Sequence, residues 1–179
     1  MHLFETTRLK ARNFTKDDLK LLNDLHSDEL LMKTTSGNVQ TIEETKKELE
    51  QIISQQEKYQ LSQWAFFTKE ENNFVGRCGI IYRNFAEEND FNFELRYAIH
   101  RHFQGLGYGG EMAKASIEYA FQNPKIQNII GSVRLDGNEA STKILQKLNF
   151  KYIQNKVFHS NKKECKIWQV SKEEWLKDK

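Results

Sequence analysis

A short glycine-rich stretch constrains the fold of this chain more than any other feature. Residues 102–112 read HFQGLGYGGEM and contain Gly105, Gly107, Gly109 and Gly110, which are four of the nine glycines in the sequence. Glycine lets the backbone take positive φ angles and lets another group approach it closely. The stretch follows a strand pattern and precedes a helix pattern, so its amides and the start of the helix are suited to hold a phosphate group.

Hydrophobic patterns predict the elements on both sides of this stretch. Capping boxes at Thr15 with Asp18 and at Thr41 with Glu44 begin two helices, the second running to about Glu57. Alternating or apolar runs indicate strands. The predicted strands are at Leu9 to Ala11 and at residues 62–68, 74–82, 91–99, 128–135, 151–158 and 165–170, with further helices after Gly107, from Asn138 to Lys147 and after Ser171. A tight hairpin at Glu70 to Asn73 and a turn region at Asn84 to Asp90 make the three strands before the glycines antiparallel neighbours.

Length and charge exclude several classes of protein. A chain of 179 residues forms one core, so we expect one domain over residues 1–179. Its 27 Lys and Arg against 25 Asp and Glu give a net charge of +2, scattered along the chain, which argues against direct nucleic-acid binding. No apolar run approaches the roughly 20 residues that span a bilayer, and no leader pattern is seen, so we expect a cytoplasmic monomer or homodimer without membrane contact. Cys78 and Cys165 offer neither a disulfide framework nor metal-ligand spacing.

The context of the glycines decides between two phosphate-binding motifs. Gly105-x-Gly107-x-x-Gly110 is the dinucleotide pattern, whereas Gln104-x-x-Gly107-x-Gly109 fits the phosphate loop of acyl-coenzyme A enzymes. A dinucleotide fold runs from its strand almost directly into the first glycine, but here residues 100–104 intervene, and too little chain follows for a doubly wound sheet. No Gly-Lys-Ser/Thr follows either, so a Walker A loop is excluded. The context favours the acyl-coenzyme A loop.

Four segments in order resemble the GNAT superfamily of N-acetyltransferases. QGLGYG fits that superfamily's Q/R-x-x-G-x-G/A motif, and FETTRLKAR, FVGRCGI, FELRYAIHRHFQGLGYGGEM and NEASTKILQKLNF resemble the branch of the ribosomal-protein N-terminal acetyltransferases. The resemblance covers about residues 3–170. It implies an α/β fold with a mixed, mostly antiparallel sheet, flanked by helices and splayed between the fourth and fifth strands. It also implies acetyl transfer from acetyl-coenzyme A (acetyl-CoA) to a primary amine, of a protein N-terminus or of a small molecule, without a metal.

The resemblance implies a set of residues that bind acetyl-CoA. The loop would cradle the pyrophosphate, and the end of the preceding strand would pair with the pantetheine arm like an added strand. The loop residues are Gln104, Gly105, Leu106, Gly107, Tyr108 and Gly109, and the strand residues are Ala98, Ile99 and His100. The amide near Ala98 would polarise the thioester carbonyl. Asn138 and Ser141 would bind the cofactor arm, or for Asn138 the acceptor.

Attack on a thioester requires a neutral amine, so the reaction needs a base. Strict alternation in residues 91–99 places Glu94 on the polar face, away from Phe93 and Tyr97. Glu94 is therefore the candidate general base, and the alternative is a surface carboxylate paired with Arg96 or a lysine. Many members carry a tyrosine in the helix after the fifth strand to protonate the thiolate, but Leu145 stands there. We expect Ser141 to take that role, directly or through water, the alternative being an ordinary helix residue.

Other features bear on the acceptor and the order of events. Neither cysteine lies beside the loop, so we expect direct transfer in a ternary complex. Arg96 stands where the branch often has glycine, which indicates an unusual acceptor pocket. Acidic residues in two loops suggest a cationic acceptor; these are Asp28, Glu29, Glu87, Glu88 and Asp90. The alternatives are an acyl-CoA-binding module without turnover and a nucleotide-dependent oxidoreductase. His100 and His102 have no third ligand, so we expect no metal site.

Overall fold

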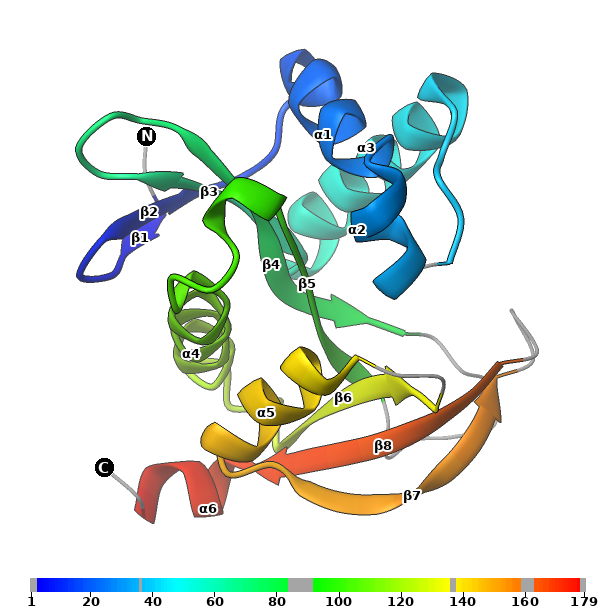
Figure 1. The fold of residues 1–179 in the computed structure, drawn as a ribbon. Helices are drawn as coiled ribbons and strands as arrows, with labels where there is room; N and C mark the ends of the chain where they lie inside the picture. The colour runs from blue at the N-terminus through cyan, green and yellow to red at the C-terminus, as the bar shows by residue number, and fades with distance from the viewer. Residues whose placement is uncertain (1–2, 36, 84–91, 136–137, 159–162, 178–179) are drawn as a thin grey trace.

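The computed structural model describes residues 3–35, 37–83, 92–135, 138–158 and 163–177. Strands in these ranges form an eight-stranded sheet in the order β1-β2-β3-β4-β5-β6-β8-β7. Helices cover both faces, with α1 to α3 on one face and α4 and α5 on the other (Figure 1). The predicted mixed, mostly antiparallel sheet is confirmed.

One half of the sheet comes from the first part of the chain. It contains β1 (Phe4–Glu5), β2 (Leu9–Arg12), β3 (Gln63–Thr68), β4 (Phe74–Tyr82) and β5 (Phe93–Ile99), each antiparallel to its neighbour. Between β3 and β4, Asn72 takes a φ of 58°, as the predicted tight turn requires.

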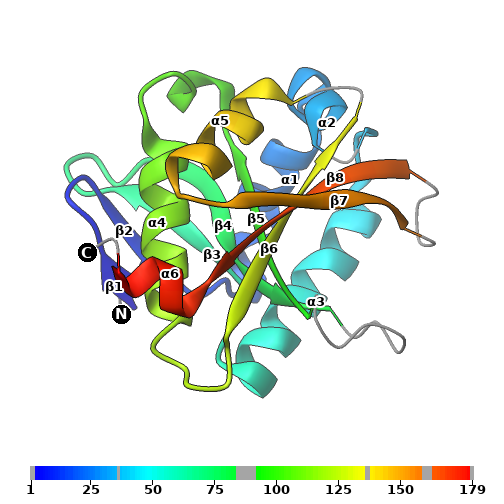
Figure 2. The ribbon, with the colours of Figure 1, turned by 90° about the horizontal axis from the view of Figure 1, so that it is seen from below.

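The other half contains β6 (Asn128–Arg134), β8 (Lys163–Ser171) and β7 (Lys151–Phe158), which lie together on the side of the molecule that faces the viewer in Figure 2. The two halves meet where β5 runs parallel to β6. A single register pair, Glu94 with Ile130, joins these two strands. The sheet therefore opens between β5 and β6. These are the fourth and fifth of the strands predicted from the sequence, between which the resemblance implies the opening.

The helices pack on the sheet through two apolar clusters. On one face lie η1 (Lys16–Asp18), α1 (Leu19–His26), α2 (Glu29–Thr34) and α3 (Ile42–Tyr59), and on the other lie η3 (Arg101–Phe103), α4 (Tyr108–Ala120) and α5 (Glu139–Lys147), with α6 (Lys172–Lys177) at the end. Leu22, Leu49 and Phe67 belong to the cluster under α1 and α3. The larger cluster, under α4, includes Met112 and Ile117. Leu22 of α1, Leu49 of α3 and Met112 of α4 are buried, so these helices pack on the sheet through apolar residues, whereas Ile42 at the start of α3 is 50% exposed.

Local signals in the sequence explain most element boundaries. The capping boxes at Thr15 and Thr41 are both formed, and the Ser171 hydroxyl accepts a hydrogen bond from the Glu174 amide at 3.2 Å. Three short elements were not predicted: β1, which has two residues, α2, which has six, and η3, which has three. The region between α1 and α3 is therefore partly helical, with Asp28 accepting a bond from the Leu31 amide at its start.

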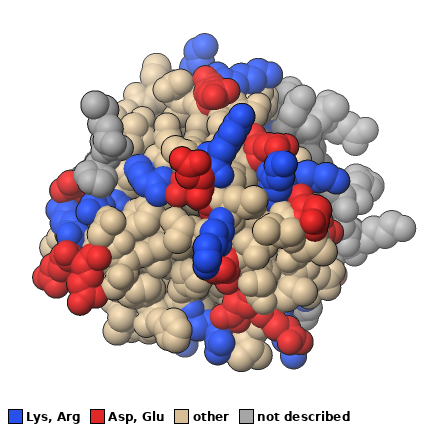
Figure 3. Space-filling model, turned by 90° about the horizontal axis from the view of Figure 1, so that it is seen from above, with Lys and Arg blue, Asp and Glu red and all other residues tan. Residues whose placement is uncertain are grey.

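The face of the molecule seen in Figure 3 carries charges of both signs. In Figure 3, Lys and Arg side chains are interspersed with Asp and Glu, and the described residues on that face form no continuous basic patch. None of the helices within the described ranges combines the length and apolar character needed to cross a bilayer.

Candidate active site

The glycine loop is shaped by two residues with left-handed backbone. Gly105 and Gly107 have φ angles of 78° and 82°, and Gly107 immediately precedes α4. Side chains other than glycine are strained at such angles, so these two positions need glycine. A Cβ built on Gly105 would meet no atom within 4 Å, which leaves the outer side of the loop open to a bound group.

Arg8 braces this loop from the turn between β1 and β2. Its Nη1 donates a hydrogen bond of 2.9 Å to the carbonyl oxygen of Leu106, and its Nη2 lies 2.7 Å from the carboxylate of Glu111 in α4. The guanidinium also lies over the Tyr108 ring, 4.3 Å from its centroid. Gln104, the first residue of the motif, donates from Nε2 to the Ile99 carbonyl at 3.1 Å and so ties the loop to the end of β5.

Gly109 is required for packing. A Cβ there would lie 2.9 Å from Cδ1 of Ile99 and 3.0 Å from Cδ1 of Ile144, whereas at the next residue, Gly110, it would meet nothing within 4 Å. The Cβ direction of Gly109 thus points into the protein, between β5, α4 and α5. This small residue lets the helix start approach the strand end closely.

A cavity of about 360 Å³ lies where β5 and β6 diverge. It brings together residues from both halves of the sheet and from the ends of α2 and α5. The lining residues are Thr34, Thr35, Gln63, Arg77, Arg83, Glu94, Leu95, Arg96, Tyr97, Ser132, Val133, Arg134, Asn138, Ser141 and Cys165. Three residues singled out in the sequence, Glu94, Asn138 and Ser141, therefore share one site.

Glu94 is the most buried charged residue of this cavity. It is 1% exposed, so it does not lie on the surface, whereas the pairing with Arg96 that the alternative interpretation expected is present. Its Oε2 lies 2.9 Å from Nη1 of Arg83 and 3.1 Å from Nε of Arg96, and its Oε1 accepts a short hydrogen bond from the Ser132 hydroxyl. Each carboxylate oxygen can accept two bonds. Glu94 is held firmly in the cavity wall, and its Oε1 can still accept one further hydrogen bond from a bound group.

A pair of hydroxyls lies on the other side of β5. The Tyr97 Oη is 2.6 Å from Oγ of Ser141, and burial raises the pKa of Tyr97 to about 12, although the bond to Ser141 opposes that shift. Tyr97 was placed on the apolar face by the sequence, which is correct for its ring, but its hydroxyl reaches into the site. Leu145 is 2% exposed and packs beside Gly131, where it cannot act as an acid.

Asn138 is already engaged by the protein. Its Oδ1 accepts a hydrogen bond of 2.9 Å from the Ser141 amide as the cap of α5, and its Nδ2 donates to the Thr34 carbonyl at 3.2 Å. The side chain therefore connects α5 with the end of α2 at the rim of the cavity. Its visible contacts position Ser141.

The two cysteines differ in their surroundings. Cys78 is buried in the core, where burial raises its pKa to about 12, and it accepts a hydrogen bond from Ser116 at 3.3 Å. Cys165, which is 4% exposed, lines the cavity. The sequence placed both in apolar strands and gave no sign that Cys165 would approach the site.

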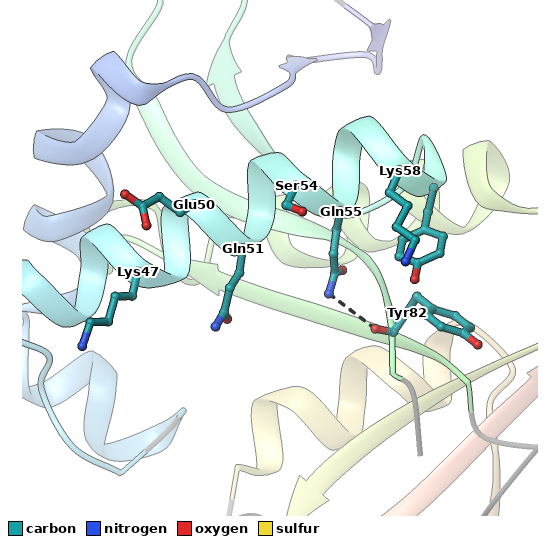
Figure 4. Close-up of a pocket in the computed structure, with 8 residues that line it drawn as sticks. Lys47, Glu50, Gln51, Ser54, Gln55, Lys58 and Tyr82 are labelled. Carbon is teal, nitrogen blue, oxygen red and sulfur yellow. Dashed lines mark hydrogen bonds between the residues drawn. The ribbon is translucent and has the colours of Figure 1, made fainter. Parts of the chain in front are cut away.

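A second cavity, of about 650 Å³, lies on the outer side of α3. Figure 4 shows Lys47, Gln51 and Gln55 projecting from one side of the helix, with Gln55 Nε2 donating to the Tyr82 carbonyl at 3.4 Å. Its lining is long flexible polar side chains and two tyrosines. The paired carboxylate and hydroxyls of the first cavity are a far better basis for chemistry, so we take that cavity as the candidate active site.

The histidines near the loop do not form a metal site with other described residues. The His100 ring packs edge-on against Phe74 with centroids 5.6 Å apart, and burial lowers its pKa. Among the parts of the chain that the structure describes, no three His, Cys, Asp or Glu side chains gather as metal ligands would.

Comparison with known families identifies the fold and its class of chemistry. A family model described as "Acetyltransferase (GNAT) domain" matches residues 8–151. The chain belongs to this GNAT acetyltransferase family. It is an N-acetyltransferase enzyme, and GNAT acetyltransferases use acetyl-CoA, which fits the open glycine loop and the diverging strands.

Two curated relatives come from Bacillus subtilis strain 168. The uncharacterized N-acetyltransferase YnaD is 24% identical over 151 residues, which are 84% of this chain and 83% of YnaD. The uncharacterized protein YkkB is 30% identical over 94 residues, 52% of this chain. That match spans about half the length of YkkB, 53%.

Solved structures share the fold at low sequence identity. RimL, a ribosomal L7/L12 α-N-protein acetyltransferase in complex with CoA, has a TM-score of 0.77 at 15% identity, covering 97% of this chain and 99% of that one. Spermidine N-acetyltransferase from Vibrio cholerae, in complex with CoA and spermine, has a TM-score of 0.72 at 15% identity, covering 94% and 98%. The likeness to a ribosomal-protein acetyltransferase fold is confirmed.

Proposed function

We propose that this enzyme transfers an acetyl group from acetyl-CoA directly to a primary amine, of a protein N-terminus or a small molecule, while both are bound. One observation carries the proposal. At the point where β5 and β6 diverge, a buried carboxylate, Glu94, and a hydroxyl pair, Tyr97 with Ser141, line the same cavity from the two sides of β5. A reacting centre between them has a proton acceptor on one side and a donor on the other.

The acyl donor would be held by backbone groups. The amides of the loop from Gln104 through Gly109 suit the pyrophosphate, because the start of α4 adds its positive end. Ala98 and Ile99 lie on the part of β5 beyond its one pairing with β6, and His100 follows directly, with its amide donating to the Val75 carbonyl of β4 at 2.9 Å. The opposite edge of this strand end is suited to pair with the pantetheine arm. The amide near Ala98 would polarise the thioester carbonyl.

The proton transfers follow from the positions of the side chains. Glu94 takes a proton from the amine, and the amine nitrogen then bonds to the carbonyl carbon as the carbon–sulfur bond breaks. The sulfur receives a proton through the Ser141 hydroxyl, directly or through a water. The raised pKa of Tyr97 keeps its phenol protonated near pH 7. Either hydroxyl could donate in the Tyr97–Ser141 hydrogen bond, and in this proposal Tyr97 donates and orients the Ser141 hydroxyl.

Transfer without an acetylated enzyme is supported by the cysteines. A thiol with a pKa near 12, as for Cys78, is a poor nucleophile, and the core position of Cys78 separates it from the cavity. Cys165 lines the cavity, so it is the residue on which this part of the proposal is tested.

Initial-rate kinetics test the proposal. Thiol release is measured while acetyl-CoA and an amine are both varied, using N-terminal peptides of ribosomal proteins beside small amines. Intersecting plots support a ternary complex, whereas parallel lines refute it. Calorimetry should detect binding of acetyl-CoA but not of a nicotinamide dinucleotide. Tight binding of acetyl-CoA without thiol release for any amine would instead indicate a binding module.

A further inference from the structure

Among the described residues, four guanidinium groups line the candidate active site. Arg77 comes from β4, Arg83 follows β4, Arg96 comes from β5 and Arg134 ends β6, and all four line the cavity. Among the described lining residues, Glu94 has a carboxylate. A second carboxylate, that of Glu48 in α3, pairs with Arg77 but is not part of the lining. His26 beside Glu48 is buried, and its pKa of about 4 leaves it neutral at pH 7.

Arg77 is a buried guanidinium in the cavity wall whose hydrogen-bonding capacity the described residues only partly use. It is 9% exposed, and its Nη1 donates to Glu48 at 2.7 Å and to Gln63 at 2.6 Å. Its buried Nε has no hydrogen-bond partner among the described residues. A buried N–H without a partner is unfavourable, and guanidinium groups pair best with carboxylates and phosphates.

Arg96 lies beside Arg77 and Glu94 on the same face of the sheet. In the β4–β5 register Arg77 is opposite Ala98, and Arg96 and Glu94 follow at steps of two residues along β5. The Arg96 side chain is 44% exposed and contacts Glu94 at 3.1 Å. The cavity thus offers a carboxylate and a guanidinium in contact, with a second guanidinium beside them. A small molecule with an amine and an anionic group a few bonds apart is complementary to this arrangement.

We propose that the acceptor is a small amine carrying a carboxylate or phosphate group, whose anion binds Arg96 and Arg77 while its amine faces Glu94. The proposal rests on the acetyl transfer proposed above. The cavity volume of about 360 Å³ suits a molecule of amino-acid size. This departs from the cationic acceptor suggested by the sequence. Asp28 is occupied, because it pairs with Arg101 at 2.7 Å and caps α2, and Glu87, Glu88 and Asp90 lie outside the described residues.

The test compares acceptors that differ in one anionic group. Glycine is paired with glycinamide, and 2-aminoethyl phosphate with ethanolamine, while spermidine and a peptide with acidic residues after its free N-terminus complete the panel. The uncharged partners have amines that are at least as easily deprotonated as those of the anionic ones, so amine basicity does not explain a preference for the anion. We expect kcat/KM to be about 10- to 100-fold higher for at least one anionic member of a pair.

Two single-charge variants locate the effect. Arg96→Gln should remove most of the preference within each pair, chiefly through KM for the anionic acceptor, and leave KM for acetyl-CoA unchanged. Lys47→Gln removes one charge from the outer cavity of Figure 4 and should leave the preference as it is in the wild type. Because the preference is a ratio, a general loss of activity through displacement of Glu94 does not change it.

The outcomes separate this proposal from the general one. Equal or better turnover of the neutral partners or spermidine would overturn the anionic acceptor and leave acetyl transfer standing. Preference for the acidic peptide over every small anion would overturn the small-molecule assignment. Calorimetry of N-acetylglycine against N-acetylglycinamide, each in the presence of CoA, reads the anion site without turnover. Equal binding of both by the wild-type protein would also refute it, and so would a preference for N-acetylglycine that Arg96→Gln leaves unchanged.

Discussion

The close packing around Gly109 predicts that an added methyl group destabilises the protein, and the neighbouring Gly110 supplies the matched control. Gly109→Ala adds a Cβ at 2.9 and 3.0 Å from the Cδ1 atoms of Ile99 and Ile144, so both must retreat by about 0.5 Å to reach ordinary contact. Such overpacking costs about 1–3 kcal/mol, and the lower part of that range applies because both atoms are ends of flexible side chains. Gly110→Ala adds a Cβ that meets nothing.

The two variants share the same gain in helix propensity, which is about 0.5–1 kcal/mol for alanine over glycine. Their difference in the free energy of unfolding therefore isolates the overpacking. We expect Gly109→Ala to be less stable than Gly110→Ala by about 1–2 kcal/mol. For a chain of this size, that corresponds to roughly 2–8 °C in Tm. Urea unfolding of both variants beside the wild type measures it.

The same substitution should weaken the binding of acetyl-CoA, since Ile99 belongs to the strand end that would pair with the pantetheine arm. Calorimetry should show a lower affinity for Gly109→Ala and an unchanged one for Gly110→Ala. If both variants unfold with the same free energy, within about 0.5 kcal/mol, the close approach of α4 to β5 is not the reason for this glycine.

Four further predictions concern chemistry and pH. Glu94→Gln should keep the affinity for acetyl-CoA and lower kcat by about 100-fold or more near pH 7, and a retained rate at every pH would exclude a general base. Tyr97→Phe should lower kcat less than Ser141→Ala in thiol-release assays, because Tyr97 acts through Ser141; the opposite order would make the phenol the donor. Cys165→Ala should stay active with intersecting plots, whereas an acetylated wild-type protein trapped without amine would reopen covalent catalysis. The free energy of unfolding should fall by on the order of 3 kcal/mol as the pH falls from 6.5 to 4, because burial and Arg77 lower the pKa of His26 to about 4 in the folded protein. In this pH range the unfolded chain binds a proton at His26 that the folded protein does not bind. Denaturant curves for His26→Gln should lack this pH dependence.

Local signals made most of the fold predictable from the sequence. The Thr41–Glu44 capping box and the apolar stripe that follows give α3, and the alternation in residues 93–99 gives both the strand and the face of Glu94. The glycines give the loop because only a few backbone conformations join that strand to that helix. The sequence did not predict α2, whose six residues bury only Leu31 and Met32 and so carry no period to detect.

The composition of the cavity was much less predictable. Arg77, Arg83 and Arg134 meet there because strand pairing brings β4 and β6 beside β5, and no local pattern contains that register. Arg8 contacts the loop from 98 residues earlier in the chain. It belongs to the segment FETTRLKAR, which supported the family resemblance but for which the sequence predicted no role. The hydroxyl of Tyr97 was hidden by its ring, since alternation reports which face a side chain takes and not where its polar end reaches.

The single pairing between β5 and β6 also affects the stability of the protein and its tendency to aggregate. It forms a seam between two half-sheets built from separate stretches of chain, and along the seam both strands carry backbone groups that the other does not satisfy. Exposed strand edges invite pairing with other chains. A ligand that lies in the seam stabilises the folded state by about 2.7 kcal/mol at 100 times its dissociation constant. A bound acyl donor would therefore hold the two half-sheets together and protect the protein from aggregation until an amine binds.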